Sequence, residues 1–462
     1  MRLRVAFAAG TLAAFMLAGP AFAQKQGGTL KVSHRDNPPS ASIHEESTIS
    51  VNQPFMAVFN NLVFFDPKEK VNSPDKIVPD LAESWSWNAD KTKLTFKLRE
   101  GVKWHDGKPF SSADVKCTWD ALIGKGDEKL DLIRKNPRKV WYINLKEVTT
   151  SGPNEVTFTL GRPQPSFLTM LAGGYSPVYS CHVPGRDMRS KPIGTGPFKV
   201  VDFKRNESIK LVKNPDYWKK GRPYLDAIDW TIVPNRSTRM LGFTSGAYDM
   251  TFDSDVTFPL LKDVKAQKPD AVCEARPTNV NANILINRDA PPFDKPEVRR
   301  ALVLAIDQKP FNDILFEGHA LYGAAMLPPP AGFWGMPKEM LETLPGFGTD
   351  IAKNRAEARA IMEKLGYTKD KPLKIKVATR NIAIYRDPAV ILIDQLKAIN
   401  IEAELDPIDT TVWYNKIQRK DYSVGMNLTG GGVDDPDTAF YENFHSSSAD
   451  CFSIRASTSG FL

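Results

Sequence analysis

The sequence has few of the residues from which metal sites and redox centres are built. Its 462 residues include four cysteines and six histidines. No two cysteines form a C-x-x-C pair, and no two histidines are three or four positions apart, which is the spacing of a helical metal pair. The G-x-S-x-G motif of a nucleophilic serine is also missing. We therefore expect no enzymatic activity, no metal and no cofactor.

The chain also lacks a strong charge imbalance and a long apolar run in its main body. It carries 61 basic and 54 acidic residues, for a net charge of +7. The basic residues are scattered among acids, whereas a nucleic-acid footprint needs them clustered. After the N-terminus, no segment has the 18 uninterrupted apolar residues of a membrane-spanning helix. These features predict a solvated surface and no nucleic-acid partner.

The N-terminus has the three parts of a secretory signal peptide. Two early arginines precede the mostly apolar run Val5–Leu17, and Ala21–Ala23 has the small-x-small form of a cleavage site. A membrane anchor is the alternative, but this run is too short to span a bilayer. We predict export, with residues 1–23 removed and 462 − 23 = 439 residues left. Because single cores stop growing at roughly 250–300 residues, two or more lobes are expected.

The cysteines of an exported chain can form disulfides. Cys117, Cys181, Cys273 and Cys451 allow three complete pairings, and the sequence does not choose among them. Cys117 lies in a predicted helix and is expected to be a small buried residue rather than half of a bridge.

The first half of the chain has the alternating pattern of half-buried strands. Leu94, Phe96 and Leu98 share one face of a predicted strand, and residues 198–218 hold two β-rich runs around a turn. Helices become prominent later. One is predicted to open at Pro296, and another to have Asp350 as its N-cap.

The second half alternates between strands and helices. Predicted strands Leu373–Arg380, Ile401–Leu405 and Ser423–Gly430 are separated by predicted helices Asp387–Asn400 and Thr411–Tyr422. This β-α-β-α-β order predicts a parallel sheet with helices packed on it. Ligands of open α/β sheets bind at the carboxyl ends of the strands. Thr379 and Arg380 should therefore lie at the same rim as Leu428 to Gly430.

Three glycines and a group of carboxylates follow this last strand end, in the stretch LTGGGVDDPD. No phosphate-loop lysine follows the glycines, so close approach to a ligand and a plain turn both remain open. Asp434, Asp435 and Asp437 do not fit the calcium pattern of an EF-hand. We expect Asp437 to cap the next helix instead. The amides of Asn281 and Asn283 either line a polar cleft or satisfy a loop.

Four blocks of sequence resemble those of a known family. They are Pro79–Leu122, Gly194–Phe203, Leu211–Ile228 and Pro291–Gln308. Together they resemble, in order, the signature of the peptide/nickel class (family 5) of solute-binding proteins of ABC uptake transporters, which are relatives of dipeptide- and oligopeptide-binding proteins. The resemblance extends to about Phe444.

The resemblance implies an α/β, two-lobe periplasmic-binding-protein fold (type II, cluster C) with an extra subdomain in lobe one. A protein of this kind is a periplasmic monomer that captures a small solute, peptide-like or a related polar compound, and delivers it to an ABC permease. A sensing receptor without transport and a secreted hydrolase are the alternatives. The implied division is signal peptide 1–23, lobe I 24–63 and 187–273, extra subdomain 64–186, lobe II 274–444 and an atypical tail 445–462.

The resemblance also implies where the ligand would lie. Peptide binders carry a Trp and an Asp at this strand end, and here these positions are Thr429 and Gly432, which argues against a peptide amine held there. Arg380 would pair with an anionic group, and Tyr385 and Trp334 would pack against the ligand. The full set of expected contacts is Asn281, Asn283, Trp334, Arg380, Tyr385, Thr429, Gly430, Gly431, Gly432 and Asp434.

From about His445 the sequence matches no block of the family. Relatives continue and return to lobe one. We therefore expect a truncated or frameshifted product that lacks the last strand and helix of that lobe.

Overall fold

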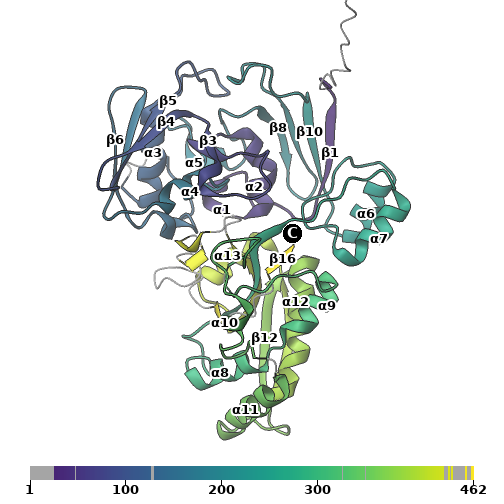
Figure 1. Ribbon diagram of the computed structural model, residues 1–462. Coiled ribbons are helices and arrows are strands. Elements are labelled where there is room, and N and C mark those ends of the chain that lie inside the picture. Colours follow the sequence, from purple (N-terminus) through teal and green to yellow (C-terminus); the bar gives the residue numbers. More distant parts are fainter. Residues whose placement is uncertain are drawn as a thin grey trace, which may run out of the picture.

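The computed structural model describes residues 25–46, 48–125, 130–324, 326–348, 350–430, 435–437 and 439–440, and the backbone of 453–454 and 459–461. The predicted signal peptide, Cys451 and most of the tail lie outside these residues. The remainder forms an upper body around two four-stranded sheets and a lower body around a six-stranded sheet (Figure 1). Within the described residues, no helix is long and apolar enough to cross a membrane.

The first sheet has the order β1-β10-β9-β8. The predicted hairpin is confirmed, since β8 and β9 pair antiparallel and Asn206 takes a φ of 62° in their turn. β1 pairs parallel with β10, so both strands end at the lower edge of the lobe, which faces the second body. The strands are β1 (Thr29–His34), β8 (Phe198–Lys204), β9 (Ser208–Lys213) and β10 (Ala227–Ile232), with helices α1 (Ile43–Glu46), α2 (Ile49–Phe55), α6 (Arg236–Thr244) and α7 (Phe258–Gln267).

The second sheet, of order β4-β5-β7-β6, holds its own aromatic core. Leu94, Phe96 and Leu98 are fully buried, which confirms the alternation predicted for that strand. The elements here are β2 (Val63–Phe65), β3 (Ile77–Pro79), β4 (Ala82–Trp87), β5 (Lys93–Leu98), β6 (Leu145–Thr150), β7 (Glu155–Leu160), α3 (Ser112–Ile123), α4 (Ser166–Ala172) and α5 (Gly185–Met188).

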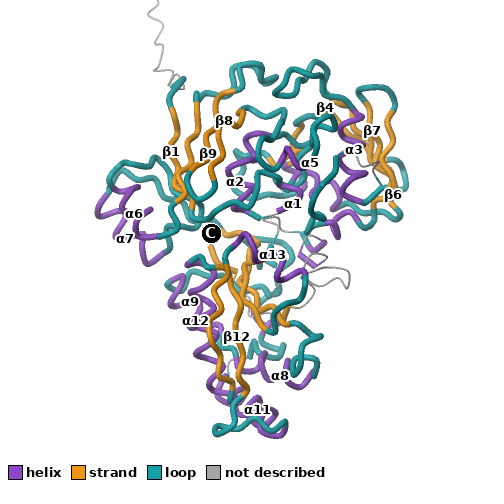
Figure 2. The backbone as a smooth tube through the Cα atoms, turned by 180° about the vertical axis from the view of Figure 1, so that it is seen from behind, coloured by secondary structure: helices purple, strands orange, loops and turns teal. Residues whose placement is uncertain are grey.

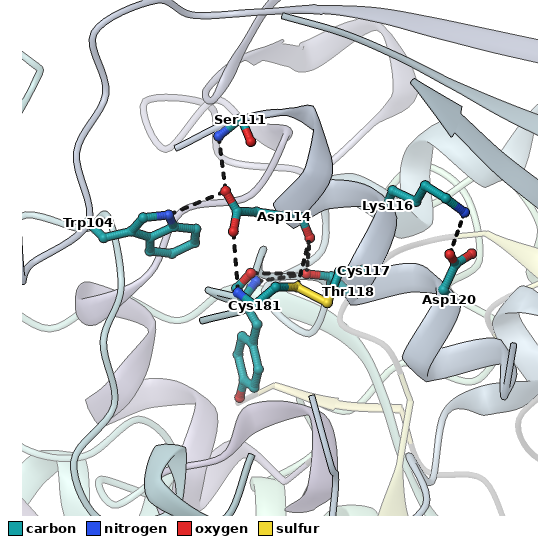
Figure 3. The surroundings of a disulfide bond; sticks show 9 residues. Trp104, Ser111, Asp114, Lys116, Cys117, Thr118, Asp120 and Cys181 are labelled. Atoms are coloured by element: carbon teal, nitrogen blue, oxygen red, sulfur yellow. Dashed lines mark hydrogen bonds and ion pairs between the residues drawn. A yellow bond between two sulfur atoms is a disulfide. The ribbon is translucent and has the colours of Figure 1, made fainter. Parts of the chain in front are cut away.

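The expectation for Cys117 is wrong, because Cys117 and Cys181 form a disulfide (Figure 3). The neighbouring Thr118 hydroxyl accepts the backbone N–H of Tyr179 at 3.0 Å, and Asp114 Oδ1 accepts that of Cys181 at 3.2 Å. These bonds hold residues 179–181 against α3 and bring the two Cα atoms within 6.2 Å, the reach of a disulfide. Helical periodicity shows that Cys117 is on α3 but does not show which segment packs against it.

The third sheet confirms the predicted parallel unit. β12 (Leu373–Arg380) has the predicted bounds and pairs parallel with both β13 (Ile401–Ile408) and β14 (Val424–Thr429). β11 (Pro277–Ile286) joins antiparallel to β14, so the sheet is mixed. Its order is β13-β12-β14-β11-β15, where β15 (Ser453–Ile454) and β16 (Ser459–Phe461) both pair with β11. The helices are α8 (Pro296–Ala305), α9 (Gln308–Phe316), α10 (Lys338–Leu341), α11 (Ile351–Lys364), α12 (Ala383–Leu396) and α13 (Thr410–Gln418).

The helix starts were predicted with mixed success. Pro296 opens α8, and the Asp350 side chain accepts the N–H of Lys353 at 3.0 Å as the N-cap of α11. The cap assigned to Asp437 is wrong, because Asp435 Oδ1 accepts the N–H of Asp437 at 2.9 Å. The Asp437 carboxylate instead accepts hydrogen bonds from Gln164 and Ser166 of the second-sheet region. Asp435 and Asp437, on either side of Pro436, offer similar local caps, and the contact with a distant segment engages Asp437.

Candidate ligand-binding site between the lobes

β11 and β14 are antiparallel neighbours in the lower sheet, and their two faces differ in chemistry. Since Asn281 pairs with Thr429 and Asn283 with Asn427, these four polar side chains share one face. We call it the amide face. Val280, Ala282 and Leu428 alternate with them and line a cavity on the opposite face, the cavity face. Figures 1 and 2 show α13 on one flank of this region and α6, α7, α9 and α12 on the other.

The amide face is buried and only partly satisfied by the described residues. The Asn283 side-chain amide donates to the Thr429 hydroxyl, which brings two of the predicted contacts together. The side-chain carbonyls of Asn283 and Asn427 have no hydrogen-bond partner among the described residues. Asn287 has a different role, because its amide donates to the backbone of Lys420 and Tyr422 at 3.0 and 2.9 Å and so holds a loop. Asn281 and Asn283 share this buried face, and their role as ligand contacts stays a prediction.

Arg380 joins the two lobes through a fully buried ion pair. Its Nη2 donates to Asp36, which follows β1, and to the Ser50 hydroxyl of α2 at 3.1 Å. Nη1 donates to the Tyr385 hydroxyl at 2.7 Å, and Nε donates to Thr410 Oγ1 at 3.0 Å. The side chains of Arg380 and Asp36 are 1% and 8% exposed. All three guanidinium nitrogens thus have protein partners, and the role of Arg380 as a ligand contact stays a prediction.

The protein stabilises the ionised carboxylate of Asp36 in this ion pair. Burial by itself would raise the pKa of Asp36, but Arg380 and the Ser50 hydroxyl outweigh it and the pKa is lowered. His34 lies beside Asp36 and donates from Nε2 to the Ser50 carbonyl at 2.9 Å. Burial lowers the pKa of His34 to about 4, so its ring is neutral at pH 7.

The remaining predicted contacts are spread out or lie outside the described residues. Trp334 is 58% exposed on a loop and lines no part of the cavity. Gly430 directly follows β14 with a φ of 144°, a backbone angle that side chains disfavour. Gly431, Gly432 and Asp434 are outside the described residues, so their roles stay predictions.

The cavity on the other face has a volume of about 660 Å³, is partly open to solvent and is lined by residues of both lobes. Most of its lining side chains are apolar, among them Phe252 from the upper lobe and Phe316, Ile384 and Leu428 from the lower lobe. At one edge, Arg236 of α6 pairs with Asp387 of α12 at 3.5 Å, which is a second ionic contact between the lobes. Small-molecule sites typically have volumes of roughly 300–1,000 Å³ and mostly apolar linings.

Sequence reasoning missed the contributions of the upper lobe, notably Asp36, Ser50 and Asp253. Asp36 closely follows the carboxyl end of β1, and Asp253 follows the short bridge between Val32 and Met250. The rule that places ligands at strand carboxyl ends holds for the upper lobe as well as the lower lobe, and there it points to these two segments. The described residues contain no group of three or more side chains arranged to hold a metal ion.

The chain matches a known protein family over most of its length. The family model "Bacterial extracellular solute-binding proteins, family 5 Middle" matches residues 76–450. The chain belongs to this family. The members compared below are binding proteins, in agreement with the expectation that the chain is not an enzyme.

Two curated relatives show how far the similarity extends. Heme-binding protein A of Haemophilus influenzae is 31% identical over 306 residues, covering 61% of this chain and 53% of the relative. Di/tripeptide-binding protein 2 of Pseudomonas aeruginosa is 25% identical over 423 residues, covering 86% of this chain and 75% of the relative. The chain thus spans about half to three quarters of the length of these relatives.

A solved structure confirms the fold. The oligopeptide-binding protein of Bacillus subtilis in complex with a nonapeptide superposes with a TM-score of 0.78 at 24% identity, covering 94% of this chain and 85% of that one. At this identity the likeness establishes the two-lobe fold alone. The lobe boundaries predicted from the sequence remain predictions.

Proposed function

We propose that the protein is the exported solute-binding component of an ABC import system, working in the periplasm as a monomer. The observation that carries this proposal is the cavity of about 660 Å³ lined by residues of both lobes. A site shared between two lobes couples occupancy to their closure, because a ligand that contacts both lobes stabilises the closed arrangement. A membrane permease can then distinguish loaded from empty protein by shape.

The names of the relatives do not choose the ligand. They include a haem binder and a di/tripeptide binder, and the superposed structure holds a nonapeptide. We therefore propose that the ligand is a small solute, either peptide-like or a related polar compound. The side chains of this chain decide which chemical class of ligand it binds.

A thermal-shift screen tests the binding step. The library contains short peptides, chelated nickel, oligosaccharides and opine-like amino acids. A solute at 100 times its Kd should add about 2.7 kcal/mol to the free energy of unfolding, and small-angle scattering should show the molecule becoming more compact. If no solute stabilises the protein, the proposal fails.

Uptake measurements test the transport step separately. A strain that lacks this protein should lose uptake of the labelled solute identified in the screen, and the intact chain should restore it. Uptake that persists without the protein, although the solute binds it in vitro, would contradict delivery to a permease.

A further inference from the structure

The cavity face carries more acidic than basic residues among its apolar lining. Five of the lining residues are acids, namely Asp249, Asp253, Asp270, Glu274 and Asp387, and two, Arg236 and Lys268, are bases. Asp270 and Glu274 are largely exposed, and an excess of acid around a mostly apolar space favours a cationic occupant over a neutral or anionic one. Which carboxylate would meet that cation depends on which of them is already paired.

Four of the five acids have partners within the protein. Asp249 accepts the N–H of Lys31 at 2.8 Å, Asp270 pairs with Lys268 at 3.4 Å, and Asp387 pairs with Arg236 at 3.5 Å. Glu274 pairs with Arg276. No hydrogen bond or ion pair from the described residues reaches the carboxylate of Asp253. The nearby Arg35 donates to the backbone carbonyl of Asp253 at 3.3 Å and to the Ser254 hydroxyl at 2.5 Å instead.

Asp253 lines the cavity and is exposed, so a ligand there can reach it. Desolvation by the surrounding protein raises the pKa of its carboxyl, against the attraction of Arg35. The second neighbouring acid, Asp255, is neutralised by Arg239 through two hydrogen bonds of 2.7 Å.

We propose that the cavity binds an apolar solute carrying one cationic amine, and that Asp253 is the residue that holds the amine. This inference rests on the proposed function and names the ligand class of the same interlobe site. The apolar body of the solute would contact Phe252, Phe316, Ile384 and Leu428.

Three probes with one apolar body and different charges test the inference. They are leucyl-phenylalanine amide, which is cationic, its neutral N-acetyl derivative, and the anionic N-acetyl-leucyl-phenylalanine, each titrated into the full chain by calorimetry. Because a charge-assisted hydrogen bond strengthens binding by about tenfold or more, the cationic probe should bind about tenfold more tightly than the neutral one. The anionic probe should bind most weakly.

Asp253→Asn should reduce the preference for the cationic probe to less than about threefold, because it removes the charge and keeps the shape. Asp270→Asn is the matched control, since Asp270 lines the same cavity and is already paired with Lys268. It should keep the preference of the wild type.

The inference is overturned if the cationic probe fails to bind, if the neutral probe binds equally well, or if Asp253→Asn retains the full preference. When one of these results occurs although another solute binds in the thermal-shift screen, the inference alone fails. When no solute binds at all, the proposed function fails with it.

Discussion

The amide face and the cavity face are the two sides of β11 and β14. Charged residues beside the first face are paired within the protein, whereas beside the second face one carboxylate has no partner among the described residues. Beside the amide face, Arg380 and Asp36 are both buried and each has hydrogen-bond partners from the protein. On the cavity face, Asp253 faces open space without a partner among the described residues. A buried charge that is fully paired holds the lobes together, whereas an unpaired one is available to a ligand.

This difference explains why residues predicted by family resemblance and residues that line the cavity are separate sets. Arg380 and Tyr385 were expected to contact a ligand and in the structure bond to each other. Leu428 and Thr429 are sequence neighbours, yet they point to opposite faces of one strand. Adjacent positions on a strand can therefore serve closure and ligand binding separately.

The largest expected difference between the two faces is at Asp36. We expect Asp36→Asn to lower the free energy of unfolding by about 3–5 kcal/mol, because Arg380 would be left buried without a counter-ion. Urea unfolding at pH 7 measures the change, and small-angle scattering reports whether the lobes separate to hydrate Arg380. The isosteric control, Asp253→Asn, should leave stability unchanged or slightly raised. Equal losses from the two substitutions would abolish the distinction between the faces.

Removal of the disulfide should lower the stability of the protein without changing either face. Replacing both Cys117 and Cys181 with alanine should cost about 2–4 kcal/mol, since the bond closes a long loop in the unfolded chain with a sequence separation of 64 residues. Thermal unfolding with and without reductant measures it. The ranking of the three charged probes should not change. A changed ranking would mean that the second-sheet region also shapes the ligand site.

His34, which lies beside the buried ion pair, should make the stability of the protein depend on pH. Its folded-state pKa of about 4 lies below the unfolded value of 6.5, so the unfolded chain binds more protons between these values. Its contribution to stability is complete above pH 6.5 and is lost as the pH falls towards 4. We expect His34→Gln to reduce the slope of unfolding free energy against pH in this window by up to about 1.4 kcal/mol per unit. An unchanged slope would show that His34 is not buried as a neutral ring.

Trp334 should give the smallest effect. Because its side chain is 58% exposed and lines neither face, Trp334→Ala is expected to change the free energy of unfolding by less than about 0.5 kcal/mol. Its affinity for any solute found in the screen should change by less than about twofold. A tenfold loss of affinity would instead support the contact predicted from the sequence and would add this loop to the site.

Local pattern was enough to predict the elements and their direction. The bounds of β12, the cap by Asp350 and the parallel unit of β12, β13 and β14 all depend on residues close together in the chain. The start of α12 was predicted at Asp387, but the helix begins at Ala383 and includes Pro388. Pro388 is the sixth residue of the helix, beyond the first turn, so its missing N–H removes one intrahelical hydrogen bond, and burial of the helix face that holds Pro388, Ala389 and Leu392 offsets this loss.

The sequence by itself determined the family and the order of strands and helices. It did so because periodicity, turn residues and family blocks act over short distances along the chain. Only the tertiary structure decided which side chains meet across the lobes. Asp36 and Arg380 are 344 positions apart, and Cys117 and Cys181 are 64 apart. Such pairings follow from how whole lobes pack, and so does the freedom of Asp253 to receive a ligand.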